Sequence, residues 1–302
     1  MIDVASLFER RLTYPHPTAR DRLERLIGLD EHKTKLTKML GLLVHPKGLT
    51  EWGERHHPGA DFLLSSVLNR PPLVILAGDV GSGKTELAES IGDAVARQEQ
   101  IDVELLPLSL STRGQGKVGQ MTQLLSAAFD FTVKEAMRMK SDGAVILLVD
   151  EADALAQSRE SEMHHEDRSG VNTFIRGIDR LASSGLPAAV IMCTNRYHSL
   201  DPAVRRRSAE LLVFERPSED SRRRLLGARL AAIGFGPADV EGLVQATGPS
   251  EDGVPGFTYS DMMQRLIPTI VLDAYPDSAI RPERAVELAR QMRPTAAFKD
   301  EV

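Results

Sequence analysis

An α/β domain followed by a small helical domain is the fold class that this sequence predicts. Up to Pro217, short apolar runs alternate with segments whose apolar residues recur at helical spacing. Alternation of this kind indicates a parallel sheet with helices on both faces. After Pro217 only helical patterns follow. With 302 residues, of which 42% are hydrophobic, the chain is long and apolar enough to form both domains.

The beginning of the chain precedes this regular alternation. Residues 1–26 are charged and contain two prolines, so we expect an N-terminal extension or a short helical arm there. Helical spacing follows in the second half of LIGLDEHKTKLTKMLGLLV. The glycines and prolines of HPKGLTEWGERHHPG (45–59) then predict a loop or a short insertion. We therefore expect the α/β domain over 27–217 and the helical domain over 218–302.

Five apolar runs predict the strands of the sheet. Each run is nearly continuous, as expected of a strand that is buried on both faces. Five parallel strands flanked by helices are therefore predicted. The runs are LVILAG (73–78), VELLPLSL (103–110), AVILLVDE (144–151), AAVIMCTN (188–195) and ELLVFERP (210–217).

Helical spacing defines the remaining elements. After the first strand, Leu87, Ile91 and Val95 fall on one face of a predicted helix. Ser218, followed by acidic residues, fits the start of the first C-terminal helix. The other predicted helices span 118–139, 169–182, 237–246, 258–274 and 281–292.

The stretch GDVGSGKT (78–85) matches the P-loop pattern G-x-x-x-x-G-K-[ST], and it lies between a strand and a helix. Glycines let backbone N–H groups approach a polyphosphate, and the helix start attracts the same anion. Lys84 would bind the β- and γ-phosphates of ATP, and the Thr85 hydroxyl would bind Mg²⁺. The alternative is a tight turn with an incidental lysine. The predicted nucleotide-binding residues here are Asp79, Val80, Gly81, Ser82, Gly83, Lys84, Thr85 and Glu86.

The run AVILLVDE ends in Asp150 and Glu151, the pattern of a Walker B element. Asp150 would hold Mg²⁺ together with Thr85, and Glu151 would act as the general base for the attacking water. Many buried strands end in acidic residues, so this pattern alone is weak. Its place after the P-loop, with one strand between them, strengthens the prediction of an ATPase.

Polar residues after the later strands complete the predicted site. Asn195 follows the fourth strand and could hydrogen-bond the γ-phosphate or the water, although such a residue is often only a strand-end cap. LDPAVRRRSAE (200–210) contains three consecutive arginines, which are either a solvated basic turn or the source of an arginine finger for a neighbouring subunit. We predict Arg207 as the finger and Arg206 as the second choice; Arg205 remains open.

In this order, the motifs resemble the AAA+ ATPases, and among them the AAA clade proper, from Ile27 to about residue 275. IGLDEHKTKL looks like the segment that contacts adenine, through Ile27 and Gly28, and GFTYSDM (256–262) looks like the clade's lid motif. Where some relatives carry a sensing arginine the lid has Ser260, with Arg265 one turn later. The resemblance implies a homo-hexamer that acts on a protein client through a central pore.

The resemblance also places substrate loops. Gln115, Gly116, Lys117 and Val118 would form the first pore loop, with Lys117 where an aromatic residue usually grips the client. Such a loop would grip a polar or acidic peptide. The segment SRESEMHHEDR (158–168) would form the second pore loop.

A finer resemblance comes from residues 170–195 and DPAVRRRSAE, which look like the pachytene-checkpoint remodellers. Those enzymes partly unfold HORMA-domain proteins, and bacterial relatives sit beside cyclic-oligonucleotide synthases in antiphage systems. A HORMA-domain client is therefore the implied partner. Alternatives are a DNA-associated AAA+ ATPase, such as a transposition targeting factor or a helicase loader, and a metabolic-enzyme activase.

Composition limits these alternatives. The net charge of −6 counts against a nucleic-acid partner, because phosphate neutralisation needs clustered Lys and Arg. No apolar run is long enough to span a bilayer, so we expect no membrane partner. Cys193 is the only cysteine, and the N-terminal segment lacks the apolar core of a signal peptide, so we expect a cytoplasmic protein.

Overall fold

The structure, a computed structural model, describes residues 7–8, 10–110, 120–140, 142–156, 165–196 and 200–297. The chain forms two compact units. The domain boundaries predicted near residues 26 and 217 stay a prediction. The first unit consists of residues 1–25, 31–77 and 84–213, and the second of residues 26–30, 78–83 and 214–302.

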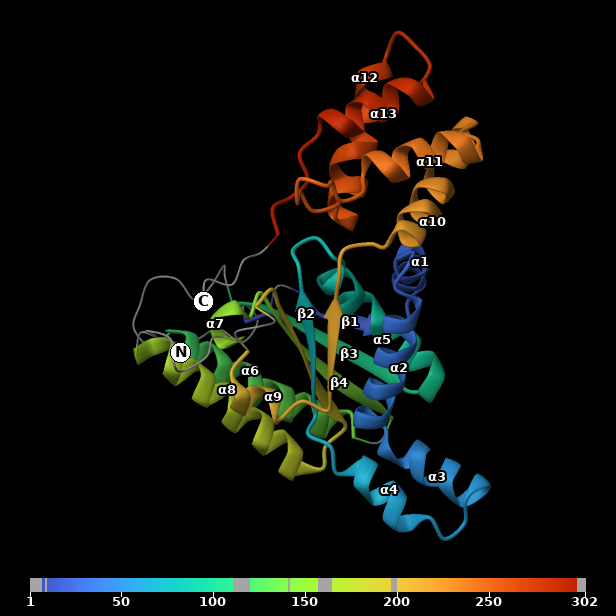
Figure 1. Ribbon diagram of the computed structural model, residues 1–302. Helices are drawn as coiled ribbons and strands as arrows, with labels where there is room; N and C mark the ends of the chain where they lie inside the picture. The colour runs from blue at the N-terminus through green and yellow to red at the C-terminus, as the bar shows by residue number, and fades with distance from the viewer. Residues whose placement is uncertain are drawn as a thin grey trace. The chain divides into compact units, whose positions relative to one another are not determined.

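A six-stranded sheet with the order β1-β3-β4-β5-β2-β6 forms the centre of the first unit (Figure 1). The pairs β2–β5, β3–β4 and β4–β5 are parallel, so the predicted α/β class with a parallel sheet is confirmed. Every residue of β2 and β5 is buried, which explains their continuous apolar sequences. The strands are β1 (Leu12–Tyr14), β2 (Leu73–Gly78), β3 (Asp102–Ser109), β4 (Gly143–Asp150), β5 (Ala188–Thr194) and β6 (Glu210–Phe214).

The sequence did not predict β1, so the expectation of five strands was one strand short. This strand runs antiparallel to β3 and places Tyr14 opposite Val103. The Tyr14 hydroxyl donates a hydrogen bond to the carbonyl oxygen of Glu89. Its ring packs directly against Gly92, where an added Cβ would lie 2.4 Å from a ring carbon. Three residues are too few to show strand alternation, which is why the sequence pattern missed β1.

Helices cover both faces of this sheet. Figure 1 shows α1, α2 and α5 on one face and α6 and α8 on the other. Alternate β2 residues such as Leu73 and Ile75 belong to the core cluster that includes Phe129 of α6 and Phe174 of α8. The helices are α1 (Pro17–Arg25), α2 (Asp30–Val44), α3 (Pro46–His56), α4 (Asp61–Leu68), α5 (Lys84–Glu99), α6 (Gln120–Arg138), α7 (Asp153–Ala156), α8 (His165–Ser184) and α9 (Pro202–Arg205).

The segment predicted as a loop, residues 45–59, contains helix α3 instead. Pro46 occupies the first turn of that helix, where a missing N–H costs nothing. Gly53 lets α4 pack closely, since a Cβ there would lie 2.2 Å from a methyl carbon of Leu64. The proline and the glycine therefore do not mark a loop here. Pro46 starts helix α3, and Gly53 permits its close contact with α4.

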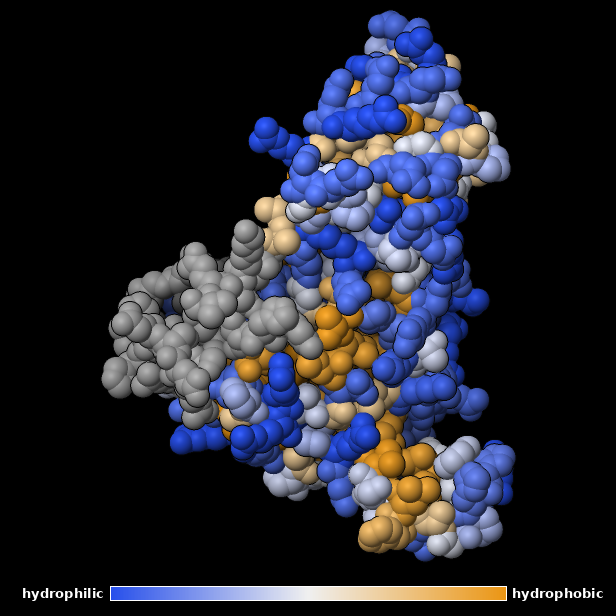
Figure 2. All heavy atoms as spheres, in the orientation of Figure 1, coloured by the Kyte–Doolittle hydropathy of each residue, from blue (hydrophilic) through white to orange (hydrophobic). Residues whose placement is uncertain are grey.

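Apolar side chains gather on the surface of α3 and α4, as Figure 2 shows in orange. On α4, Phe62 is 91% exposed and Leu63 is 65% exposed, and Trp52 of α3 is 46% exposed. Exposed apolar surface of this kind is typical of a contact with another protein chain.

The second unit contains a helical core formed by α10 to α13. Leu226, Leu243, Phe257 and Leu266 are among its buried residues. None of the helices within the described part of the chain is long and apolar enough to cross a membrane. The elements are α10 (Glu219–Leu230), the 3₁₀ turn η2 (Ala231–Ile233), α11 (Pro237–Ala246), the π-helical turn η3 (Asp261–Leu266), α12 (Ile267–Ala274) and α13 (Pro282–Gln291).

Candidate nucleotide site

The P-loop, residues 78–85, connects β2 directly to α5. The backbone φ values of the three P-loop glycines are 147° at Gly78, 71° at Gly81 and 96° at Gly83. Residues other than glycine rarely adopt positive φ values of this kind. At Gly78 a Cβ would lie 2.1 Å from the carbonyl oxygen of Phe214, so only glycine fits there. The glycines are thus needed for the backbone path of the loop.

The lid motif packs against this loop within the second unit. The Ser260 N–H donates to the carbonyl oxygen of Gly81 at 3.1 Å. A Cβ on Gly81 would lie 2.8 Å from both the Cβ of Ser260 and the Oγ1 of Thr258. Ser260, which the sequence analysis considered only as the position of a missing sensor, therefore contacts the loop through its backbone.

The predicted magnesium ligands lie together in the first unit. Thr85 Oγ1 donates to Asp150 Oδ1 at 3.3 Å. Burial raises the pKa of Asp150, and hydrogen bonds from the Glu151 N–H and from Thr85 act in the opposite direction. A hydroxyl and a carboxylate fit Mg²⁺, which usually takes one or two protein oxygens and completes its shell with water and phosphate oxygens. Lys84, which is 7% exposed, begins α5 beside Thr85.

Glu151, the predicted general base, follows β4 with a φ of 52°. Its Oε2 accepts a hydrogen bond of 2.8 Å from the hydroxyl of Ser109, which ends β3 next to Asp150 in the sheet register. A residue other than glycine in the left-handed region has a less favourable local backbone energy, which surrounding contacts must offset. Ser109 was not predicted from sequence, although it is a polar residue at the carboxyl end of a neighbouring strand.

Asn195 is held by Asp153, a second residue that the sequence analysis passed over. One oxygen of Asp153 accepts from the Asn195 N–H at 2.7 Å and from the Thr194 hydroxyl at 2.8 Å. The other oxygen accepts from Asn195 Nδ2 at 3.1 Å. The carboxylate therefore fixes the orientation of the Asn195 amide at the end of β5. Asp153 stands two residues after Glu151, so its acidic type was visible but its partner was not.

The three consecutive arginines at the end of α9 and directly after it, Arg205 to Arg207, differ in their surroundings. Arg207 donates to both carboxylate oxygens of Asp179, at 2.7 and 3.1 Å, and this contact raises the pKa of Arg207. Arg205 and Arg206 are exposed, and their side chains form no ion pair with the rest of the described chain. The structure thus shows Arg207 oriented by α8, with the neighbouring guanidinium groups directed to solvent.

The residues suggested for adenine contact lie in the second unit. Gly28 has a φ of 83°, and a Cβ there would lie 2.7 Å from the Tyr259 hydroxyl and 2.9 Å from Ser221 Oγ. Ile27 packs against the helical core of the same unit. Both residues therefore belong with the lid motif and α10.

The side chains of the other predicted nucleotide-binding residues have different environments. Ser82 is buried, Val80 is 42% exposed, and the Asp79 side chain forms an ion pair with Arg216. Arg22 of α1 donates to both oxygens of Glu86, at 2.6 and 2.8 Å. The side chains of Asp79 in the loop and of Glu86 in α5 thus have partners of their own, so their backbone N–H groups are what they could offer to a phosphate.

The predicted pore loops lie mostly outside the described residues. Gln115, Gly116, Lys117 and Val118 fall in the gap between 110 and 120, and most of 158–168 falls in the gap before α8. Both assignments stay predictions.

Comparison with known proteins bears on these motifs. Residues 74–216 match the model of the ATPase family associated with various cellular activities (AAA). The chain is 59% identical over 300 residues to CD-NTase-associated protein 6 of Escherichia coli strain MS 115-1. The alignment covers 97% of this chain and 96% of that protein.

Solved structures agree with this similarity. A chain of the HORMA:CdnC:Trip13 complex from E. coli MS115-1 is 59% identical, with a TM-score of 0.91 over 98% of this chain and 99% of that chain. Trip13 from Rhizobiales is 55% identical, with a TM-score of 0.77 over 96% of this chain and 99% of that chain.

Proposed function

The chain belongs to the AAA family of ATPases, and from this premise we propose that it uses ATP hydrolysis to remodel a HORMA-domain protein. The family membership and the likeness to bacterial relatives of the pachytene-checkpoint remodellers confirm the resemblance predicted from sequence. One observation carries the proposal most: Ser109, Asp150 with Glu151, and Asn195 stand at the carboxyl ends of adjacent parallel strands. Ligands of α/β proteins bind at this edge of the sheet.

The proposed chemistry uses the side chains at that edge. A water molecule attacks the γ-phosphorus of ATP, Glu151 accepts the proton of that water, and the bond to the β-phosphate oxygen breaks to give ADP and phosphate. Lys84 neutralises charge on the β- and γ-phosphates, and Asn195, oriented by Asp153, donates to the γ-phosphate or the water.

Magnesium has a fitting donor set in this proposal. Thr85 and Asp150 would hold Mg²⁺, which would neutralise negative charge on the nucleotide phosphates. The 3.3 Å separation between the Thr85 hydroxyl and the Asp150 carboxylate supports this assignment.

Assembly into a homo-hexamer is part of the proposal. An arginine finger acts on the site of a neighbouring subunit, which requires the exposed segment around α9 to face another copy. Arg207 remains our first choice, since Asp179 already holds its guanidinium in one orientation, and Arg206 the second. The exposed apolar residues of α3 and α4 support a chain that works in an assembly.

The similar chains in solved structures support the choice of client. One of them is part of a complex with HORMA and CdnC, and the curated relative is named for association with a CD-NTase. We therefore infer a cytoplasmic remodeller that regulates a cyclic-oligonucleotide antiphage system by engaging its HORMA protein. The segment 115–118 would contact that client in the central pore.

The test is steady-state ATP turnover of the full chain, measured alone, with a purified HORMA-domain protein of the kind found with the E. coli relative, and with duplex DNA. We expect turnover to rise at least about threefold with the HORMA-domain protein and to stay unchanged with DNA. Glu151→Gln should lower turnover by about 1000-fold, within the range that a general base contributes.

Two results would contradict the proposal. Stimulation by DNA that falls as salt increases would favour a DNA-associated ATPase instead. Normal turnover in Glu151→Gln would remove the assigned base. The matched control is Glu219→Gln, a change of an exposed glutamate at the start of α10, which should leave turnover unchanged.

A further inference from the structure

Arg216 connects the P-loop with other segments of the second unit. It stands between β6 and α10, and its side chain is only 15% exposed. Its Nε and Nη2 contact Asp79 Oδ2 at 2.7 and 2.6 Å. Its Nη1 donates to the carbonyl oxygen of Gly256 at 2.6 Å, and Nη2 donates to that of Thr295 at 2.8 Å. One guanidinium therefore joins the P-loop, the lid motif and the segment after α13.

Asp79 is the P-loop residue that pairs with Arg216. Its Oδ1 accepts from the Val80 N–H at 2.9 Å, so the contacts with Arg216 and Val80 together engage both carboxylate oxygens. A carboxylate in the first turn of a phosphate-binding loop would repel a polyphosphate and compete with it for the N–H donors. Pairing with a guanidinium removes most of that repulsion.

Hydrogen bonds within the same unit extend from Arg216 back to the P-loop. Thr295 donates to the buried carboxylate of Asp261 through its N–H at 3.0 Å and its hydroxyl at 2.7 Å. Asp261 also accepts from the Thr258 N–H at 3.0 Å. Between these residues, the Ser260 N–H donates to the carbonyl oxygen of Gly81. The P-loop is thus held at Asp79 and at Gly81 by one connected network.

We propose that Arg216 is a positioning residue for nucleotide binding. It neutralises Asp79 and holds the P-loop against the lid motif and the Thr295 segment, so that the second unit sets the affinity for nucleotide. This inference rests on the proposed function, because it assumes that the P-loop binds ATP and ADP. An arginine suits the place, since its planar group can donate to a carboxylate and to both carbonyl oxygens at once, which a lysine cannot do in the same geometry.

The test is the dissociation constant of ADP, measured by isothermal titration calorimetry on the full chain. Arg216→Met removes the guanidinium that neutralises Asp79, and we expect ADP to bind at least about tenfold more weakly. Asp79→Asn in the same chain then removes the carboxylate charge, and the double variant should bind within about threefold of the wild type. A purely structural role of Arg216 would not produce this rescue, because the Gly256 and Thr295 contacts stay lost.

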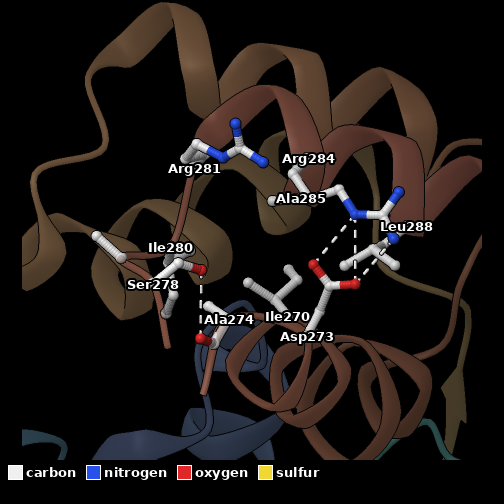
Figure 3. Close-up of a pocket in the computed structure, with 10 residues that line it drawn as sticks. Ile270, Asp273, Ala274, Ser278, Ile280, Arg281, Arg284, Ala285 and Leu288 are labelled. Carbon is white, nitrogen blue, oxygen red and sulfur yellow. Dashed lines mark hydrogen bonds and ion pairs between the residues drawn. The ribbon is translucent and has the colours of Figure 1, made fainter. Parts of the chain in front are cut away.

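Arg284→Met is the matched control. Arg284 belongs to the same unit, where it pairs with Asp273 at 2.8 Å (Figure 3). It lines a small pocket of about 20 Å³ whose lining includes no residue of the lid motif. The ADP dissociation constant of this variant should stay within about twofold of the wild-type value. It reports what the loss of an arginine ion pair costs where no phosphate site is involved.

The outcomes separate this inference from the proposed function. Wild-type protein that fails to bind ADP contradicts both. If the wild type binds and Arg216→Met binds equally well, or if the double variant binds as weakly as the single one, only the inference is overturned. Should Arg216→Met fail to fold, Arg216→Gln replaces it, again with Asp79→Asn as the second change. Binding that is weakened in the single variant and restored in the double variant supports the proposal, and equal binding in the single variant contradicts it.

Discussion

The strand ends of the sheet and the network of the second unit hold their polar side chains in different ways. At the strand ends, Glu151 is exposed, and its carboxylate accepts a hydrogen bond from the hydroxyl of Ser109. In the second unit, Asp261 is fully buried and accepts hydrogen bonds from Thr258, Thr295 and Arg265. Groups of the first kind can change partner during a reaction, whereas groups of the second kind are fixed.

This difference indicates that the two regions affect different properties of the enzyme. The strand ends carry the groups that would touch the γ-phosphate and the water, so substitutions there should change the turnover number. The second unit carries the contacts that hold the P-loop, so substitutions there should change nucleotide affinity or the stability of the fold.

Among the residues that hold the proposed catalytic groups, the largest effect is expected for Asp153→Ala. Without this carboxylate, the Asn195 amide loses the hydrogen bonds that orient it. A displacement of about 1 Å can cost a factor of about 100 in rate, so we expect kcat to fall about 100-fold with KM nearly unchanged. Steady-state ATP turnover measures both parameters.

Asp130→Ala is the control for this prediction. Asp130 is an exposed aspartate of α6 that pairs with Arg180 at 2.7 Å. Its removal should leave kcat and KM within about twofold. A loss in Asp153→Ala that falls entirely on KM would show that Asn195 is not the group being oriented.

A smaller effect, on stability, is expected for Asp261→Asn in the second unit. Burial raises the pKa of Asp261, but the hydrogen bonds from Thr258, Thr295 and Arg265 together outweigh burial and lower the pKa to about 2, against an ordinary value of 3.8. Because the folded pKa is depressed, the stabilisation is present above pH 4 and is lost as pH falls toward 2. It amounts to about 2 kcal/mol at pH 7 and about 1 kcal/mol at pH 2.5.

Urea denaturation at pH 7 and pH 2.5 measures this dependence. The gap in the free energy of unfolding between wild type and Asp261→Asn should narrow as pH falls. Asp252→Asn changes an exposed aspartate of the same unit and should follow the wild type at both values. A gap that stays constant with pH would mean that the Asp261 charge does not contribute to stability.

The smallest effect is expected for Ser109→Ala. The net value of one hydrogen bond is about 1 kcal/mol, so releasing Glu151 from this hydroxyl should lower kcat about three- to tenfold. Ser183→Ala, an exposed serine of α8, serves as the control for turnover. An unchanged kcat in Ser109→Ala would show that the contact with Glu151 does not position the base.

The strand ends were largely predictable from sequence because parallel strands bring their carboxyl ends to one edge of a sheet. Buried runs identified the strands, and the residues that follow them, such as Glu151 and Asn195, are polar types with known chemistry. Their holding partners were not predicted, since Ser109 and Asp153 are ordinary residue types whose role depends on register. The antiparallel β1 and the helix α3 were also missed, one for its shortness and the other for its glycines and proline.

The network of the second unit could not be predicted. Arg216 lies 137 residues from Asp79 and 79 residues from Thr295, and no local pattern marks these pairs. A sequence motif identifies residues that contact a shared ligand, but ion pairs between distant segments leave no periodic signal. This is why Asp79 was predicted only as a nucleotide-binding residue, although its side chain pairs with Arg216.

The central claim is that the strand ends set the rate and the second unit sets nucleotide affinity. The most direct test measures kcat at saturating ATP and the ADP dissociation constant, both on Asp153→Ala and on Arg216→Met. The account predicts a reduced kcat with unchanged ADP affinity in the first variant, and weakened ADP binding with kcat within about threefold of wild type in the second. If both variants alter the same parameter, the division between the two regions is contradicted.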